Sequence, residues 1–143
     1  MDHLDVTLAQ PLAWMNQSGP VVHGLVTELG LTPHDLIVIH DDVDLPVGRL
    51  RIKRLGGSGG HNGIRSVQTT LASEEFSRIK IGVGRPAPDE ETADYVLSPF
   101  LKEERDVVDR ALDRVVTALE SCLSEGIEKA MNRFNVRDAK GAE

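Results

Sequence analysis

Two short stretches of the sequence gather residue types that can do chemistry. Residues 56–66, GGSGGHNGIRS, run through four glycines to His61 and Asn62. Bare glycine backbone lets a large polar ligand come close, while His and Asn offer fixed hydrogen-bond donors and acceptors. Residues 40–44, HDDVD, place three acids directly after an apolar run. A carboxylate at the end of a buried strand can orient a histidine and stabilise its charged form, so Asp41 is the acid that we single out.

Each feature also has a simpler interpretation. By pattern alone the glycines favour a flexible turn, because they lack the Gly-Lys-Ser/Thr of a P-loop and do not follow the first predicted strand as a dinucleotide-binding loop would. The three acids could hold Mg²⁺, but a single short run with no distant partner is a weak metal signal, and we expect no metal site. Asn16 precedes a predicted helix, where capping the helix N-terminus is its simplest role.

The charge distribution indicates where an anionic partner would bind. The net charge of −7 argues against a nucleic-acid-binding protein when it is taken for the whole chain. Residues 49–85, however, hold eight Lys or Arg against two acids, and they flank the glycine-rich stretch. We therefore expect an anion to be met by the middle of the chain only. The single cysteine, Cys122, excludes a disulfide framework and fits a reducing cytosol, and no apolar run approaches the length of a membrane span.

Hydrophobic periodicity predicts alternating strands and helices. Strands are expected at residues 5–10, 36–40, 49–53 and 77–84, and helices at residues 16–30, 62–72, 98–126 and 126–135. This order predicts an α/β fold in which one domain, residues 1–137, has a mixed sheet flanked by helices, followed by a loose tail at residues 138–143.

The periodicity also assigns faces to these elements. The 36–40 strand is a continuous apolar run, typical of a strand buried on both faces. In the last two strands Arg51, Lys53, Arg78 and Lys80 are expected to point outward. The apolar stripe of the long helix is expected at Val108, Leu112, Val115, Leu119 and Cys122, widened by Ala111 and Val116.

Six stretches together resemble bacterial-type peptidyl-tRNA hydrolases. In chain order they are PLAWMNQSG, LIVIHDDVDLPVGRLRIK, GGSGGHNGIRS, FSRIKIGVGRP, DYVLSPF and GIEKAMNRFN. The combination of MNQSG, HDDVDLPVG and GGHNG at these spacings is far more specific than any one piece. The resemblance covers nearly the whole chain. It implies a cofactor-free enzyme that cuts the ester between a peptide and the 3′ ribose of tRNA.

The resemblance also assigns roles to residues. Asn16 would contact the substrate and place the attacking water, and Asp41 would orient a catalytic histidine. His61 and Asn62 would hold the peptide backbone and the tRNA end. The residues expected to meet tRNA phosphates are Arg51, Lys53 and Lys80. The implied protein is a cytoplasmic monomer that needs neither metal nor membrane.

One part of the family pattern has no counterpart in this sequence. The family's GLGNPG-like loop and its TRHN-like stretch, which supplies the catalytic histidine, are not matched, so the resemblance implies a complete enzyme with an upstream segment. Loss of a general base typically slows a reaction by about 10²–10⁴-fold. Two alternatives stay open: a non-catalytic relative that binds tRNA or another RNA, and a truncated domain with no activity.

Overall fold

The chain folds into two compact units. The computed structural model describes residues 5–10, 18–57, 61–84 and 102–135. One unit comprises residues 1–38 and 54–78, and the other comprises residues 39–53 and 79–143.

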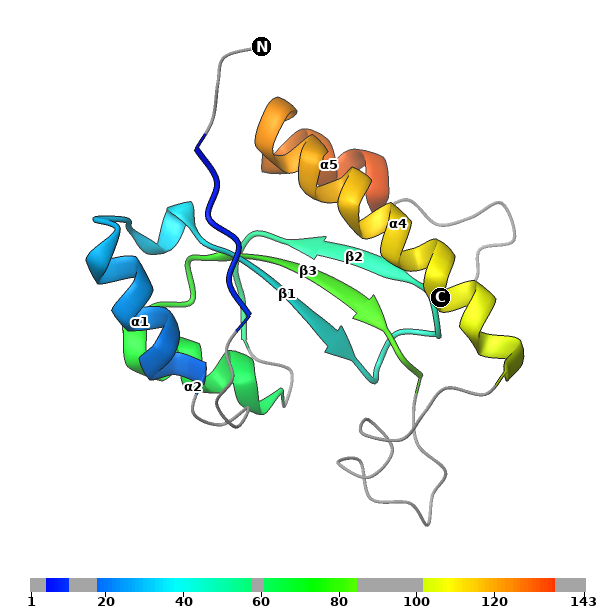
Figure 1. Cartoon of the computed structure of the whole chain (residues 1–143), viewed down its shortest axis with the longest axis horizontal. Coiled ribbons are helices and arrows are strands. Elements are labelled where there is room, and N and C mark those ends of the chain that lie inside the picture. Colours follow the sequence, from blue (N-terminus) through cyan, green and yellow to red (C-terminus); the bar gives the residue numbers. More distant parts are fainter. Residues whose placement is uncertain (1–4, 11–17, 58–60, 85–101, 136–143) are drawn as a thin grey trace. The chain divides into compact units, whose positions relative to one another are not determined.

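In the first unit two helices pack side by side. These are α1 (Ser18–Glu28) and α2 (Asn62–Leu71), and Figure 1 shows them adjacent. The contact is close because Gly19 is buried in it: the Gly19 N–H donates to Ser66 Oγ at 2.8 Å, and a Cβ at position 19 would overlap the Ser66 carbonyl and Thr70 Oγ1. After α1, a short 3₁₀ turn, η2 (Pro33–Asp35), leads into the sheet.

The core of this unit lies under α2. Ile64, Val67 and Phe76 are almost completely buried, and four further apolar side chains pack against them, namely Val22, Leu36, Val38 and Leu71. Ile64, Val67 and Leu71 thus form the inward face of α2. The helix ends at Ala72, which adopts a left-handed φ of 52° and donates its N–H to carbonyls of the last turn.

The three strands form one mixed sheet, most of which belongs to the second unit. They are β1 (Ile37–Asp42), β2 (Leu50–Lys53) and β3 (Ser77–Gly82), in the spatial order β1-β3-β2. In Figure 1, β1 and β3 run in the same direction and β2 runs opposite to them. The expected α/β fold with a mixed sheet is confirmed. The single domain expected over residues 1–137 stays a prediction, and the tail at residues 138–143 lies outside the described part.

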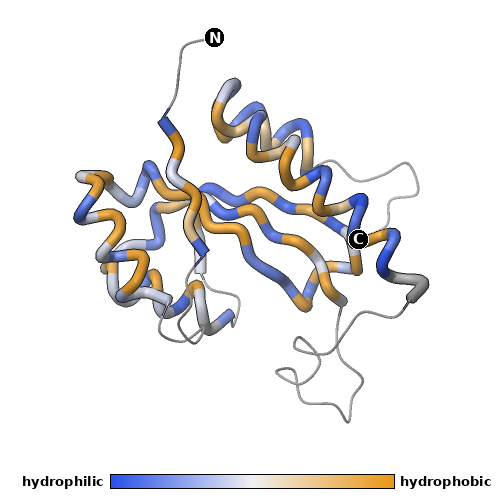
Figure 2. The backbone as a smooth tube through the Cα atoms, viewed as in Figure 1, coloured by the Kyte–Doolittle hydropathy of each residue, from blue (hydrophilic) through white to orange (hydrophobic). Residues whose placement is uncertain are grey.

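Two C-terminal helices pack along β2 in the second unit. They are α4 (Lys102–Glu125) and α5 (Ile127–Phe134), and Figure 2 shows polar and apolar residues alternating along both. The stripe expected on the long helix is only partly right, because Leu112 and Val116 are 51% and 56% exposed. Val108, Ala111, Val115 and Cys122 are buried as expected. Ala118, which was not expected in the stripe, is also buried, so the packed face of α4 is rotated away from Leu112 and Val116. Among the described residues, no helix is long and apolar enough to cross a membrane.

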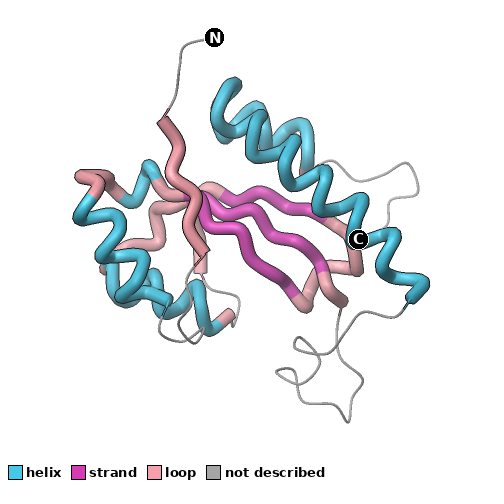
Figure 3. Tube along the Cα trace, in the orientation of Figure 1, coloured by secondary structure: helices cyan, strands magenta, loops and turns pink. Residues whose placement is uncertain are grey.

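Two strand expectations were wrong. Residues 5–10 form no strand (Figure 3) and do not belong to the sheet; Val6 and Leu8 are 49% and 81% exposed. Alternation alone cannot make a strand, because the backbone also needs a neighbour to pair with. The apolar run of β1 was expected to be buried on both faces, yet β1 is an edge strand with Ile39 47% exposed.

The opposite edge of the sheet, at β2, is closed by one side chain. The Asn135 amide accepts the Ile52 N–H at 2.7 Å and donates to the Ile52 carbonyl at 2.8 Å. Asn135 follows the last turn of α5, so the helix holds the amide where a neighbouring strand would otherwise supply the same two bonds. This contact protects the β2 edge from pairing with another chain.

The Asn135 amide can be tested by substitution. Asn135→Ala leaves the N–H and C=O of the buried residue Ile52 without these partners, and we expect the free energy of unfolding in urea to fall by about 1–3 kcal/mol. The matched control is Asn132→Ala on the exposed side of α5, which should change it by no more than about 0.5 kcal/mol. Equal effects of the two substitutions would contradict the edge-closing role.

Candidate active site

His61 stands at the start of α2 and caps it. Its Nδ1 accepts the Ile64 N–H at 3.2 Å. Because a backbone N–H can only donate, Nδ1 must be the unprotonated nitrogen, and the proton of the neutral ring is on Nε2. In this tautomer His61 presents an N–H donor and not a free base. The side chain of Asn62, the next residue, lies outside what the structure describes.

The first glycines of the 56–66 stretch are held by side chains of the same unit. The Gln68 amide donates to the Gly56 carbonyl at 2.8 Å, and Arg78 Nη1 donates to the Gly57 carbonyl at 2.8 Å. Two hydrogen bonds therefore anchor the start of this stretch, whereas the flexible turn expected from the glycines would lack such contacts.

The position of Arg78 overturns one expectation. Alternation along the strand placed it outward, but it has no exposed surface. Its Nη2 also donates to the Glu74 carbonyl at 3.0 Å, and its guanidinium carbon lies 4.6 Å from the centre of the Phe76 ring. Loss of solvent lowers the pKa of Arg78, and the nearby Glu74 carboxylate partly opposes this. The carbonyls of Gly57 and Glu74 lie outside β3. The alternating pattern of a strand cannot predict partners in other segments.

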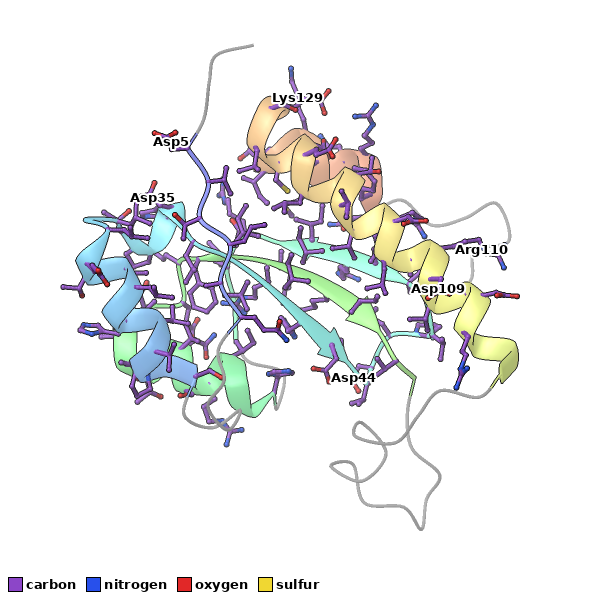
Figure 4. All side chains as sticks on the ribbon, in the orientation of Figure 1. Asp5, Asp35, Asp44, Asp109, Arg110 and Lys129 are labelled. Atoms are coloured by element: carbon purple, nitrogen blue, oxygen red, sulfur yellow. The ribbon has the colours of Figure 1, made fainter. Side chains whose placement is uncertain are left out.

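In the second unit the turn after β1 is fixed against the end of β3. Hydrogen bonds join Val83 N–H to the Asp42 carbonyl, Gly84 N–H to the Leu45 carbonyl and Gly48 N–H to the Gly82 carbonyl, each at 3.0 Å. A Cβ on Gly82 would collide with the Pro46 carbonyl, so only glycine permits this approach. Asp44 lies at this turn, as Figure 4 shows.

The acids of residues 40–44 make different contacts. Asp42 pairs with Lys80 at 3.3 Å (Asp42 Oδ2 to Lys80 Nζ), and its Oδ1 accepts the Asp44 N–H at 2.7 Å. Asp41 is half-buried in β1, and its carbonyl accepts a hydrogen bond from His40 Nδ1 at 2.7 Å. No cluster of three His, Cys, Asp or Glu side chains able to hold a metal ion occurs among the described residues.

The basic residues of this unit differ in exposure. Arg51 is exposed and Lys53 is half-buried, and along β2 they alternate with Leu50 and Ile52, which are 2% and 0% exposed. Both therefore lie on the sheet face opposite the apolar core of the unit. The Lys80 side chain is only 12% exposed and is engaged by Asp42, which weakens its expected role as a phosphate contact.

The predicted site residues within the described part of the chain fall into two groups. The first unit contains His61 and Asn62, and the second contains Asp41, Arg51, Lys53 and Lys80.

Asn16 lies outside the described residues, so its expected contact with substrate and water stays a prediction. The sequence analysis missed three residues whose side chains hydrogen-bond to backbone near the predicted site residues: Gln68, Arg78 and Asn135. An asparagine directly after an amphipathic helix was a signal for Asn135, but no pattern pointed to the other two.

Known proteins resemble this chain over nearly its whole length. The family model for peptidyl-tRNA hydrolase matches residues 1–142. A peptidyl-tRNA hydrolase of Sulfurihydrogenibium sp. (strain YO3AOP1) is 46% identical over 131 residues, which are 92% of this chain and 69% of that protein. One from Synechococcus sp. (strain JA-3-3Ab) is 45% identical over 134 residues, 94% of this chain and 60% of that protein. The chain belongs to the peptidyl-tRNA hydrolase family.

A solved structure agrees with this membership. The crystal structure of peptidyl-tRNA hydrolase from Acinetobacter baumannii superimposes with a TM-score of 0.81 at 30% sequence identity, over 88% of this chain and 64% of that one. The chain thus spans between 60% and 69% of the length of these family members. The resemblance inferred from the six sequence stretches is confirmed.

The ion pair of Asp42 with Lys80 leads to a stability prediction. Asp42→Asn leaves a poorly exposed ammonium without its counter-charge, so we expect the free energy of unfolding to fall by about 1–3 kcal/mol. The control is Glu75→Gln, which removes an ion pair with His34 whose side chains are 65% and 72% exposed, and it should cost no more than about 0.5 kcal/mol. Urea unfolding followed by circular dichroism measures both. If Asp42→Asn lowered the free energy of unfolding no more than Glu75→Gln does, the stability of the protein would not depend on the ion pair of Asp42 with Lys80.

Proposed function

We propose that the protein is a peptidyl-tRNA hydrolase, which cleaves the ester between a peptide and the 3′ ribose of tRNA. The observation that carries the proposal is the family match over residues 1–142, with relatives of this name at 45–46% identity. The reaction adds water across the ester, releasing the peptide acid and a tRNA with a free 3′ hydroxyl. Translation produces this substrate, so we propose the cytoplasm as the compartment. The monomeric state stays a prediction.

His61 serves as a donor in this proposal. Its Nδ1 accepts the bond of the helix cap, so the proton of the neutral ring is on Nε2, and this N–H would donate to a carbonyl of the peptidyl end. A donor aimed at an ester carbonyl is most useful when negative charge develops on the oxygen during attack by water. Asn62, at the first position of α2, would hold the substrate beside it.

Asp41 and Asn16 keep the roles that the resemblance gives them. Asp41 would orient the general base, and Asn16 would place the attacking water. None of the five histidines in the sequence stands at the position that the family pattern gives to that base.

The phosphates of tRNA would meet Arg51 and Lys53. These side chains lie on one face of β2, within the basic segment of residues 49–85. Phosphate contacts position a nucleic acid without reading its sequence, which suits an enzyme that must accept many tRNAs. Lys80, which is paired with Asp42, contributes less.

Ester cleavage is the direct test. N-acetylaminoacyl-tRNA is incubated with the chain, and peptide release is compared with spontaneous hydrolysis and with release from aminoacyl-tRNA whose amine is free. We expect release above the spontaneous rate and a preference for the blocked substrate. Spontaneous-rate release, together with no binding of the blocked tRNA, would refute the proposal.

The basic face makes a separate prediction. Arg51→Ala removes one phosphate contact, so the slope of log Kobs for tRNA against log salt concentration should flatten by about 1, and Arg51→Ala/Lys53→Ala should flatten it by about 2. The control is Arg110→Ala, which removes an exposed arginine of α4 labelled in Figure 4 and should leave the slope unchanged. Filter binding over about 50–200 mM salt gives the slopes. Equal slopes for all variants would place the RNA elsewhere.

A further inference from the structure

We propose that Arg78 is a positioning residue that, together with Gln68, sets where the glycine-rich stretch delivers His61. The two side chains reach carbonyls of neighbouring residues at the beginning of that stretch, Gly56 and Gly57. His61 follows the four glycines of the stretch and caps α2. The inference rests on the proposed function for the meaning of His61, but its structural part can be tested without any substrate.

The donors converge on one short piece of backbone. Gln68 projects from the middle of α2 and donates to the Gly56 carbonyl at 2.8 Å. Arg78, at the second position of β3, donates to the next carbonyl, that of Gly57, also at 2.8 Å. Glycine backbone has more conformations to lose than any other, so the two hydrogen bonds strongly restrict the backbone of Gly56 and Gly57.

Arg78 is itself held rigidly. Its planar guanidinium spans two carbonyls, at Gly57 and at Glu74, and lies against the Phe76 ring. A lysine has a single ammonium on a flexible stem and cannot reproduce this fork. The guanidinium thus links the glycine-rich stretch to the segment that leads into β3.

Stability alone does not account for a buried arginine here. Arg78 is 0% exposed, and its Nε has no hydrogen-bond partner within the described residues. Replacing a buried charge by an apolar side chain of similar volume is often neutral or stabilising when the charge serves only packing. We infer that the charge is buried here because Arg78 donates to the Gly57 carbonyl and so fixes the backbone at the start of the glycine-rich stretch.

The anchoring can be measured in the free protein. In Arg78→Met we expect the Gly57 and His61 amides to exchange with solvent about tenfold faster, because local opening becomes easier. Arg78→Lys should fall between wild type and Arg78→Met. Gln68→Leu changes a half-buried helix residue and tests the Gly56 anchor should Arg78→Met fail to fold.

Two controls separate positioning from general destabilisation. Val67→Ala opens the core of the same unit, where Val67 is 2% exposed, and its exchange is compared at matched global stability. Arg110→Met removes an exposed arginine from the other unit and should leave exchange at both amides unchanged. The proposal is overturned if neither Arg78→Met nor Gln68→Leu accelerates exchange at the Gly57 and His61 amides more than Val67→Ala does.

A binding readout connects the anchor to the substrate. The probe is an adenosine carrying an N-acetylaminoacyl group in amide linkage at its 3′ position, which this reaction cannot cleave as an ester. We expect Arg78→Met to raise the Kd of this probe about tenfold and Val67→Ala to leave it unchanged, because only the former releases His61. Failure of the wild-type chain to bind the probe counts against the proposed function, while the exchange measurement still decides the role of Arg78.

Discussion

The rest of the structure depends most on β3, which pairs with β1 on one side and with β2 on the other. It is the central strand of the sheet, so its backbone is hydrogen-bonded on both sides and its side chains have little freedom. In the first unit Arg78 reaches from it to the glycine-rich stretch. In the second unit Lys80 engages Asp42, and Gly82 admits the Pro46 carbonyl. Residues of one strand thus contact both of the stretches whose residue types could do chemistry.

The two stretches are held by different physical means. The turn after β1 is fixed by backbone hydrogen bonds and by a glycine whose missing Cβ leaves room for a carbonyl. The first two residues of the glycine-rich stretch, Gly56 and Gly57, are held instead by the side chains of Gln68 and Arg78. In the proposed reaction, a His61 donor that is already in place would cost no rearrangement when negative charge develops on the ester oxygen.

Much of the fold and the family could be predicted from the sequence. Periodicity located the helices and three of the strands, since these patterns depend on local spacing, and the order of six short stretches indicated the family. Local patterns could not predict that Arg78 turns inward, because its partners are carbonyls in other segments. They also could not show that residues 5–10 pair with no strand of the sheet, that Ile39 is exposed, or that Lys80 is engaged by Asp42, since all three depend on neighbours distant in sequence.

We propose that His61 receives the peptidyl end of a tRNA whose phosphates meet Arg51 and Lys53. The direct measurement is a ¹H–¹⁵N titration of the chain with two acceptor-stem RNA hairpins, one ending in a free 3′ hydroxyl and one carrying a 3′ N-acetylaminoacyl amide. The account predicts that both hairpins shift the amides of Arg51 and Lys53, while only the peptidyl form also shifts those of His61 and Ile64. Identical shifts with the two hairpins, or shifts that spare His61 in both, would contradict it.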